Sequence, residues 1–307
     1  MTVSLSWRWW RKVMEITVQK LTEHVLELIR LAATSLPPDV EKKLRESVQR
    51  EAEGSAAQGA LQTILQNVAL SREKSTPICQ DTGTPIFYVY HPEGVSTRAL
   101  KKRICAAVAW ATELNYLRPN AVDSLTGENS GNNIGGEHYP YIHFEEVDSD
   151  DLMVDLMLKG GGCENVGAQY KLPDGRIGAA RDLEGVRRAA LDAVHEAQGR
   201  GCAPGVLGIA VGGDRGSSFV ASKEVLFRKL DEYNPDADLA EMEARITAEA
   251  NQMGVGPMGF GGNTTVLDAK MTAMHRLPAS YFVTVSYMCW AFRRRRMVVN
   301  GDEATYE

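Results

Sequence analysis

The order of hydrophobic patterns along the chain constrains the fold more than any other feature. Apolar residues recur at helical spacing from Thr17 onward, and the Pro37-Pro38 pair ends this pattern before a charged helix that reaches Arg50. From Pro85 onward, short β-branched and aromatic runs alternate with helical patterns. We therefore predict an α+β fold, in which a helical N-terminal third precedes mixed strands and helices.

The predicted elements are separated by polar, glycine-rich loops. Strands are expected at 85–90, 141–147, 152–158, 206–211 and 281–287. Helices beyond those of the N-terminal segment are expected at 61–68, 100–114, 183–198, 222–230 and 239–253. Loops are expected at 77–84, 127–136, 160–162 and 254–262. The loop at 77–84 joins a helix to a strand, where a functional site could be carried.

The composition excludes several classes of protein and of partner. The 307 residues are 44% hydrophobic and 24% charged, which is typical of a globular protein with one large or two ordinary domains. With 34 Lys and Arg against 40 Asp and Glu, the chain lacks the basic field that holds a nucleic acid. The apolar run Cys105–Ala111 is far shorter than the roughly 18 residues of a membrane span. We expect neither a nucleic acid nor a membrane as a partner.

Residues 1–15 are predicted to be a disordered leader, and residues 16–307 to form one domain, in one or two lobes. The leader combines three tryptophans with basic residues and lacks the apolar core of a signal peptide. Two interpretations stay open. We favour a leader that reflects a start codon upstream of Met14; the alternative is a patch that docks on a membrane interface or on a partner.

The five cysteines form an odd set with irregular separations, which fits reduced thiols or metal ligands better than disulfides. We therefore expect a reducing, cytoplasmic compartment. Cys79, Cys202 and Cys289 each lie at an element boundary, whereas Cys105 fits simple packing in a helix and the role of Cys163 is open. Three thiolates from distant loops suit an iron–sulfur cubane with one open iron, but spacing alone equally allows cysteines that are packed or incidental.

The residues around these cysteines carry a resemblance that covers nearly the whole chain. The motifs are Cys79-Gln80-Asp81-Thr82-Gly83, 117–122 (LRPNAV), 126–131 (TGENSG), 159–162 (KGGG), 256–259 (GPMG) with 262–265 (GNTT), and 289–291 (CWA). In this order, they resemble the class I iron–sulfur hydro-lyases. The chain is most similar to the α subunit of the two-subunit fumarate hydratase and L(+)-tartrate dehydratase group, from about Asp39 to Arg296.

The resemblance implies a 4Fe-4S cluster on Cys79, Cys202 and Cys289, around which the α+β domain folds. The fourth iron would act as a Lewis acid on a C4 dicarboxylate, because a coordinated metal polarises a leaving hydroxyl without a strong acid. Fumarate to malate is the first expected reaction and L(+)-tartrate to oxaloacetate the second. A non-catalytic iron–sulfur or zinc protein that senses redox state or acts as a scaffold is the alternative from another class.

The resemblance also assigns roles near the cluster. Gln80 and Asp81 would orient substrate or bound water, and Arg118 would bind a substrate carboxylate through two parallel hydrogen bonds. Gly162 would offer its backbone to the substrate. Without the resemblance, Asp81 is interpreted as a turn residue and Arg118 as a solvated helix end.

One family residue is displaced in this sequence. A histidine precedes the Pro-Ala-Ser segment in the family, whereas this chain has Leu277 at that position and the nearest histidine is His275. Because alternate residues of a strand share a face, His275 is expected to substitute if this segment is strand-like. The Gly-Gly-Gly-Cys form at Cys163 resembles tartrate dehydratases, while 263–265 (NTT) is closer to fumarases, so the substrate stays open between the two.

Three further expectations concern surface residues and partners. His138 and His143 are expected to be surface or sheet-edge histidines rather than metal ligands. The run Arg293–Arg296 is expected to be solvated, or to pair with an acidic partner. The second domain of fused family members, which carries the catalytic threonine base, is not matched, so we expect a separate β subunit, an inactive chain on its own and an α2β2 heterotetramer.

Overall fold

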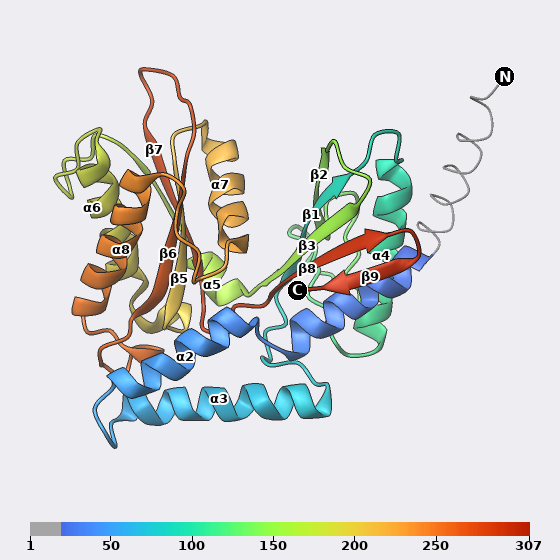
Figure 1. Ribbon diagram of the computed structural model, residues 1–307, viewed down its shortest axis with the longest axis horizontal. Coiled ribbons are helices and arrows are strands. Elements are labelled where there is room, and N and C mark those ends of the chain that lie inside the picture. The colour runs from blue at the N-terminus through green and yellow to red at the C-terminus, as the bar shows by residue number, and fades with distance from the viewer. Residues whose placement is uncertain (1–19) are drawn as a thin grey trace. The chain divides into compact units, whose positions relative to one another are not determined.

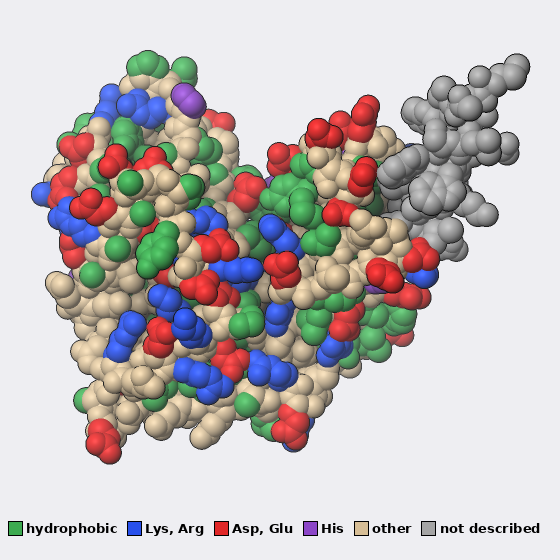
Figure 2. Space-filling view, viewed as in Figure 1, with side chains coloured by type: hydrophobic (Ala, Val, Ile, Leu, Met, Phe, Trp, Pro, Cys, Tyr) green, Lys and Arg blue, Asp and Glu red, His purple; other side chains and the backbone are tan. Residues whose placement is uncertain are grey.

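The computed structural model describes residues 20–307 and divides the chain into two compact units (Figure 1). Unit 1 contains residues up to Pro37, Val68–Lys159 and Arg293–Glu307, and unit 2 contains Pro38–Asn67 and Gly160–Phe292. The leader predicted at 1–15 lies outside the described residues. In Figure 2, acidic and basic side chains are interspersed over the visible face of each unit.

Unit 1 is built on a five-stranded mixed sheet of order β2-β1-β3-β8-β9. The strands are β1 (Thr84–His91), β2 (Tyr141–Glu146), β3 (Leu152–Lys159), β8 (Arg294–Asn300) and β9 (Glu303–Tyr306). β1 pairs with β2 in parallel and with β3 in antiparallel orientation, so β1 lies inside the sheet and is largely buried. The sheet provides the rigid base from which the preceding loop, 77–83, emerges.

Helices cover the sheet of unit 1 and close its core. Residues 20–34 are helical, and α4 (Thr97–Glu113) follows a Ser96 cap whose side chain accepts a hydrogen bond from the amide of Ala99. The apolar face of α4, including Leu100 and Ile104, packs with the helix at 20–34 and with Phe87 of β1. The helix predicted at 100–114 is thus confirmed, and it starts earlier because of the serine cap.

Unit 2 is built on a four-stranded sheet of order β4-β7-β5-β6. The strands are β4 (Ala168–Lys171), β5 (Gly205–Val211), β6 (Val266–Ala273) and β7 (Phe282–Met288). The helices are α2 (Pro38–Arg50), α3 (Ala56–Lys74, which ends in unit 1), α5 (Gly161–Asn165), α6 (Leu183–Ala197), α7 (Arg215–Glu224), α8 (Ala237–Gln252) and the short 3-10 turns η1 (Gln198–Gly201), η2 (Val225–Phe227) and η3 (Pro257–Gly259).

The sheet of unit 2 has helices on both faces. α8 packs on β6, with α6 beside it, while α7 packs on β5 and β7 (Figure 1). β5 pairs with β6 in parallel and with β7 in antiparallel orientation. The α+β class is therefore confirmed, although the helical N-terminal third is only roughly right, because β1 already begins at Thr84.

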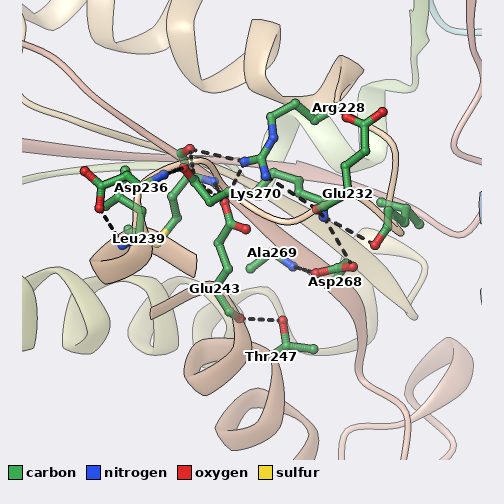
Figure 3. A network of polar contacts seen from close by, with 12 residues as sticks. Arg228, Glu232, Asp236, Leu239, Glu243, Thr247, Asp268, Ala269 and Lys270 are labelled. Atoms are coloured by element: carbon green, nitrogen blue, oxygen red, sulfur yellow. Dashed lines mark hydrogen bonds and ion pairs between the residues drawn. The ribbon is translucent and has the colours of Figure 1, made fainter. Parts of the chain in front are cut away.

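A polar network joins α8 to β6 beneath the sheet of unit 2 (Figure 3). One carboxylate oxygen of Glu243 accepts hydrogen bonds from the side chain of Arg228 at 2.7 Å, from that of Asn234 at 2.7 Å and from the amide of Met271 at 2.6 Å. Beside it, burial raises the pKa of Asp268 and lowers the pKa of Lys270. These charged groups explain why β6, which holds both residues, was not predicted as a strand.

The helix predicted at 222–230 is wrong in position. α7 covers Arg215–Glu224, and only a short 3-10 turn, Val225–Phe227, follows it. The cause is a capping box: the carboxylate of Asp214 accepts the amide of Ser217 at 3.1 Å, and the hydroxyl of Ser217 accepts the amide of Asp214 at 3.0 Å. The cap starts the helix seven residues earlier than its apolar pattern suggests.

The expectation that Arg293–Arg296 is solvated is also wrong. Arg293 is 1% exposed and Arg294 is 6% exposed, and the run enters β8. Arg296, at the exposed end of the run, makes two hydrogen bonds of 2.7 Å with the buried carboxylate of Asp155 on β3. The run thus loses most of its solvation to β8: Arg293, Arg295 and Arg296 bond to residues of unit 1 instead.

Candidate functional site

The loop Cys79–Gly83 precedes β1 in unit 1 and is held tightly against β3. Gly83 has a positive φ of 83°, and a Cβ at this position would lie 2.7 Å from the carbonyl carbon of Leu158. The carboxylate of the exposed Asp81 accepts the amide of Gly83 at 3.0 Å. Asp81 therefore forms the turn that the local sequence suggests, with its carboxylate at the surface.

Arg118 lies against this loop. Its guanidinium donates to the carbonyl of Gln80 at 3.4 Å, and its backbone amide donates to the hydroxyl of Thr82 at 3.0 Å. Arg118 is exposed at the end of the α4 connection, as are Gln80 and Asp81. Unit 1 thus brings together three predicted site residues, Gln80, Asp81 and Arg118.

A buried arginine supports the same loop from the opposite end of the chain. Arg293 is 1% exposed and donates from Nη1 to the carbonyl of Asp81 at 2.7 Å. A guanidinium stays charged at any physiological pH, so this contact places a fixed positive charge beside the loop. The sequence singled out Arg293 only as part of the run Arg293–Arg296 and gave it no role at the site.

In unit 2, Cys202 and Cys289 lie at the same end of the sheet. Val206, near the start of β5, pairs with Met288 at the end of β7, so the residues beyond these two ends are neighbours. The amide of Trp290 donates to the carbonyl of Cys202 at 3.2 Å. Cys202 has a left-handed backbone (φ 55°, ψ 62°), a conformation that is uncommon outside glycine and that clusters at functional sites.

A buried tyrosine packs against the Cys202 loop. A Cβ on Gly201 would lie 2.5 Å from Cε1 of Tyr287, and a Cβ on Gly205 would lie 2.2 Å from its Cζ. Burial raises the pKa of Tyr287, and negative charge on Cys289, Cys163 and Cys202 would raise it further. Three of the five cysteines therefore lie close enough to Tyr287 for their charge to act on its hydroxyl.

The glycine run at 160–162 begins a short helix, α5, instead of a loop. Gly162 is exposed in α5, and a Cβ on it would lie 3.8 Å from the carbonyl oxygen of Arg200 in η1, so it faces the turn that leads to Cys202. Cys163 is buried; its thiol donates to the carbonyl of Gly160 at 3.1 Å and contacts the sulfur of Met288 at 4.0 Å.

The motif at 256–259 also reaches the Cys202 loop. The amide of Met258 donates to the carbonyl of Ala203 at 2.8 Å. A pocket of about 550 Å³ lies beside it within unit 2; its lining residues are Gln198, Gly199, Arg200, Met253, Gly254, Val255, Met258, Gly259 and Gly261. Gly199 and Gly259 make the approach possible, because a Cβ on Gly199 would lie 2.8 Å from the Cα of Gly259.

Free thiols are the ligands that an iron–sulfur cluster needs, but neither unit alone contains all three of Cys79, Cys202 and Cys289. All five cysteines are free, and Cys79, Cys202 and Cys289 are each partly exposed on a loop. Among residues 20–307, no three His, Cys, Asp or Glu side chains form a group that could hold a metal ion, so Cys163 does not complete a three-ligand site with its two neighbours. Cys105 is half-buried in α4, where burial raises the pKa of its thiol.

The strand on which the His275 substitution was based does not exist. β6 ends at Ala273, and His275 lies in the exposed connection to β7. Its carbonyl accepts the amide of Gly213, beyond the C-terminal end of β5, whereas Cys202 precedes the N-terminal end of that strand. The seven residues of β5 span about 20 Å. Within unit 2, His275 therefore lies at the opposite end of the sheet from Cys202 and Cys289.

His138 and His143, the other two histidines for which a position was predicted, lie where expected. His138 is exposed, and His143 lies on β2, an edge strand, where it stacks on Tyr88 with ring centroids 4.6 Å apart. No helix within residues 20–307 has the length and apolar character needed to cross a membrane.

Comparison with known proteins gives one family. Residues 22–298 match the family described as fumarate hydratase (Fumerase). A Geobacillus stearothermophilus protein named as a fumarate hydratase class I is 48% identical over 280 residues, which are 90% of this chain and 54% of that relative. The chain thus spans about half the length of this relative.

Two relatives named as tartrate dehydratase subunits match this chain over almost their whole length. A Methanocaldococcus jannaschii protein named as an L(+)-tartrate dehydratase subunit alpha is 34% identical over 282 residues, which are 90% of this chain and 96% of the relative. The L(+)-tartrate dehydratase subunit alpha of Escherichia coli K12 is 29% identical over 291 residues, with 93% and 92% covered.

Proposed function

Because the chain belongs to the fumarate hydratase (Fumerase) family, we propose that it is the α-type part of a hydro-lyase that adds water to a C4 dicarboxylate or removes it. Fumarate to malate is the reaction that we place first. It is supported by the 48% identity to a relative named as a fumarate hydratase class I, against 34% and 29% for the tartrate dehydratase subunits.

Tartrate to oxaloacetate is the second candidate. It is supported by the near-complete coverage of the two relatives named as tartrate dehydratase subunits. The Gly-Gly-Gly-Cys form at Cys163 favours the same substrate. Cys163 is buried in α5, which contacts the η1 turn that leads to Cys202.

We propose that Cys79, Cys202 and Cys289 hold a 4Fe-4S cluster. The donor set supports this assignment: three partly exposed free thiols on loops, two of them at one end of the unit 2 sheet. When bound, the cluster supplies a Lewis-acidic iron that polarises a substrate hydroxyl.

The observation that carries the proposal is the contact between Arg118 and the Gln80-Asp81 loop. The exposed guanidinium of Arg118, which donates a hydrogen bond to this loop, can bind a substrate carboxylate through two parallel hydrogen bonds. The exposed carboxylate of Asp81, fixed by its bond to Gly83, can then accept a hydrogen bond from a substrate hydroxyl or water. Gln80 would orient the same groups, and Gly162 would offer its backbone.

We propose no role for His275 beside Cys202 and Cys289. Its position at the other end of the sheet argues against a role next to Cys202 and Cys289 of the same unit. A His275→Gln variant is therefore expected to keep the iron content of the wild type.

We propose that a β-type polypeptide completes the site, and that the assembly is an α2β2 heterotetramer in the cytoplasm. The names of the two tartrate dehydratase relatives, which are alpha subunits, support the partner. Free thiols throughout the described residues support a reducing compartment.

The test is the anaerobic reconstitution of the chain with iron and sulfide, together with its β-type partner. Fumarate and malate should interconvert, and tartrate should be converted more slowly. Conversion of tartrate alone would move the assignment to the second candidate. Stoichiometric zinc without iron, and no turnover of any hydroxy-diacid, would favour a non-catalytic metal protein instead.

A further inference from the structure

We propose that Asn133 is a positioning residue for Arg118: its side-chain amide, together with the hydroxyl of Thr82, fixes the backbone of residues 118–120 on the loop 79–83. This inference rests on the proposed function, in which Arg118 binds a substrate carboxylate. It concerns residues of unit 1 only.

The segment 118–120 has no helix or strand to hold it, and side chains satisfy its backbone instead. The amide of Arg118 donates to Thr82 Oγ1 at 3.0 Å, and its carbonyl accepts Nδ2 of Asn133 at 2.7 Å. The carbonyl of Pro119 accepts Nδ2 of Asn129 at 2.8 Å, and the amide of Asn120 donates to Oδ1 of Asn133 at 2.7 Å. Asn133 therefore supplies two of these four bonds.

Asn133 is suited to this task by chemistry and by burial. It is 1% exposed and has a φ of 60°, a left-handed conformation that asparagine tolerates better than most residues. Its Nδ2 also donates to Thr112 Oγ1 at 2.9 Å, and that hydroxyl donates to the carbonyl of Val108 inside α4 at 2.8 Å. We call the hydrogen bonds from Asn133 and Thr82 to residues 118–120 the clamp. Through Thr112, the clamp is anchored on α4. A side-chain amide supplies both the N–H donors and the acceptor that these bonds need, whereas an ionised aspartate only accepts and a leucine does neither.

Thr82 joins the clamped segment to the predicted catalytic loop. Its hydroxyl accepts the amide of Arg118 and, at 3.1 Å, Nδ2 of Asn120. Thr82 is itself 1% exposed and follows Asp81 directly. The clamp therefore sets the position of the Arg118 guanidinium relative to Gln80 and Asp81. A displacement of about 1 Å in such a group can cost about 100-fold in rate.

Two pairs of variants test the clamp in the full chain with its β-type partner. Asn133→Asp loses both donors of the buried amide, while Asn132→Asp is the matched control, because exposed Asn132 only accepts the amide of Ile134 through Oδ1. Thr82→Val loses the acceptor, while Thr82→Ser keeps it. We expect the KM for fumarate to rise about 10- to 100-fold in N133D and T82V, with a smaller change in kcat. Both controls should stay within about twofold of the wild type.

Hydrogen exchange at the amides of Arg118 and Asn120 gives a second readout that needs no turnover. The Arg118 amide should exchange faster in T82V than in T82S, because valine removes its acceptor. The Asn120 amide should stay protected in N133D, because Oδ1 of the aspartate can still accept it. Unchanged KM and unchanged exchange in folded T82V would overturn the inference, and if N133D fails to fold, the Thr82 pair alone decides. A wild-type complex that turns over no dicarboxylate contradicts the proposed function, and the exchange rates then still decide whether the clamp exists.

Discussion

The two groups of predicted site residues are held in different ways. In unit 1, the loop 79–83 and the segment 118–120 are fixed by hydrogen bonds from buried side chains, Thr82 and Asn133. In unit 2, the Cys202 loop is fixed by backbone that packs closely on a ring, with Gly201 and Gly205 against Tyr287. Substitutions that remove a polar atom should therefore disturb the site residues of unit 1. Substitutions that add side-chain volume should disturb those of unit 2.

The largest expected effect is that of added volume beside Cys202. In Gly205→Ala, the new Cβ would lie 2.2 Å from Cζ of Tyr287, which is 2% exposed and cannot move aside. We expect a loss of about 3 kcal/mol in the free energy of unfolding, measured with urea. Gly175→Ala is the control, because a Cβ there meets nothing within 4 Å. Equal stabilities of the two variants would refute the close-packing half of the comparison.

Removal of charge from the network under the unit 2 sheet comes next. Glu243→Gln weakens the acceptor of Arg228 and places an amide group beside the donors Asn234 and Met271. We expect a loss of about 2 kcal/mol in the free energy of unfolding, since bonds to charged groups contribute more than neutral ones. The exposed Glu241→Gln, on the same helix, should be neutral in the same urea titration. A neutral E243Q would show that unit 2 does not depend on this network.

The corresponding change in unit 1 is Asp155→Asn. It removes the charge of a buried carboxylate that accepts two bonds of 2.7 Å from Arg296, a half-exposed partner. Because Arg296 can turn to water, we expect a loss of about 1–2 kcal/mol. Thermal unfolding at several salt concentrations measures it, with exposed Asp150→Asn as control. A loss larger than that of E243Q would contradict the expectation that the unit 2 network contributes more.

The smallest effect concerns acid stability. The guanidinium of Arg176, bonded to Asp192 at 3.0 Å, lowers the pKa of that carboxyl below its usual value. A lowered folded-state pKa means that the stabilisation is present above the unfolded pKa of about 3.9 and is lost as the pH falls through the folded value. Asp192→Asn should therefore flatten the stability curve below about pH 4. The effect should be less than about 1 kcal/mol, because the guanidinium of Arg176 is largely exposed and water screens the pair. Unfolding curves that stay parallel to the wild type below pH 4 would contradict it.

Elements with a clear apolar pattern and a local cap were predictable from the sequence. α6 begins at Leu183 as expected, because Asp182 caps it, and β5 and β7 lie within one residue of the predicted ranges. β6 and β8 were missed because they contain charged residues, Asp268 and Arg296, whose ion-pair partners Lys43 and Asp155 come from distant segments. No local pattern encodes such a pairing.

The same limit applies to the site. The motifs place Gln80, Asp81 and Arg118 on loops, and unit 1 brings these loops together. Asn133 and Arg293 could not be recognised, because their roles depend on burial against segments far away in the chain. The predicted role of His275 was based on a strand that ends two residues before it.

The most direct test of the account is the iron content of five cysteine-to-serine variants after anaerobic reconstitution. Wild type and Cys105→Ser should each hold about four irons per chain, as should Cys163→Ser, whereas Cys79→Ser, Cys202→Ser and Cys289→Ser should each lose the cluster. Full iron content in any of the last three would show that the thiol is not a ligand and would contradict the central claim.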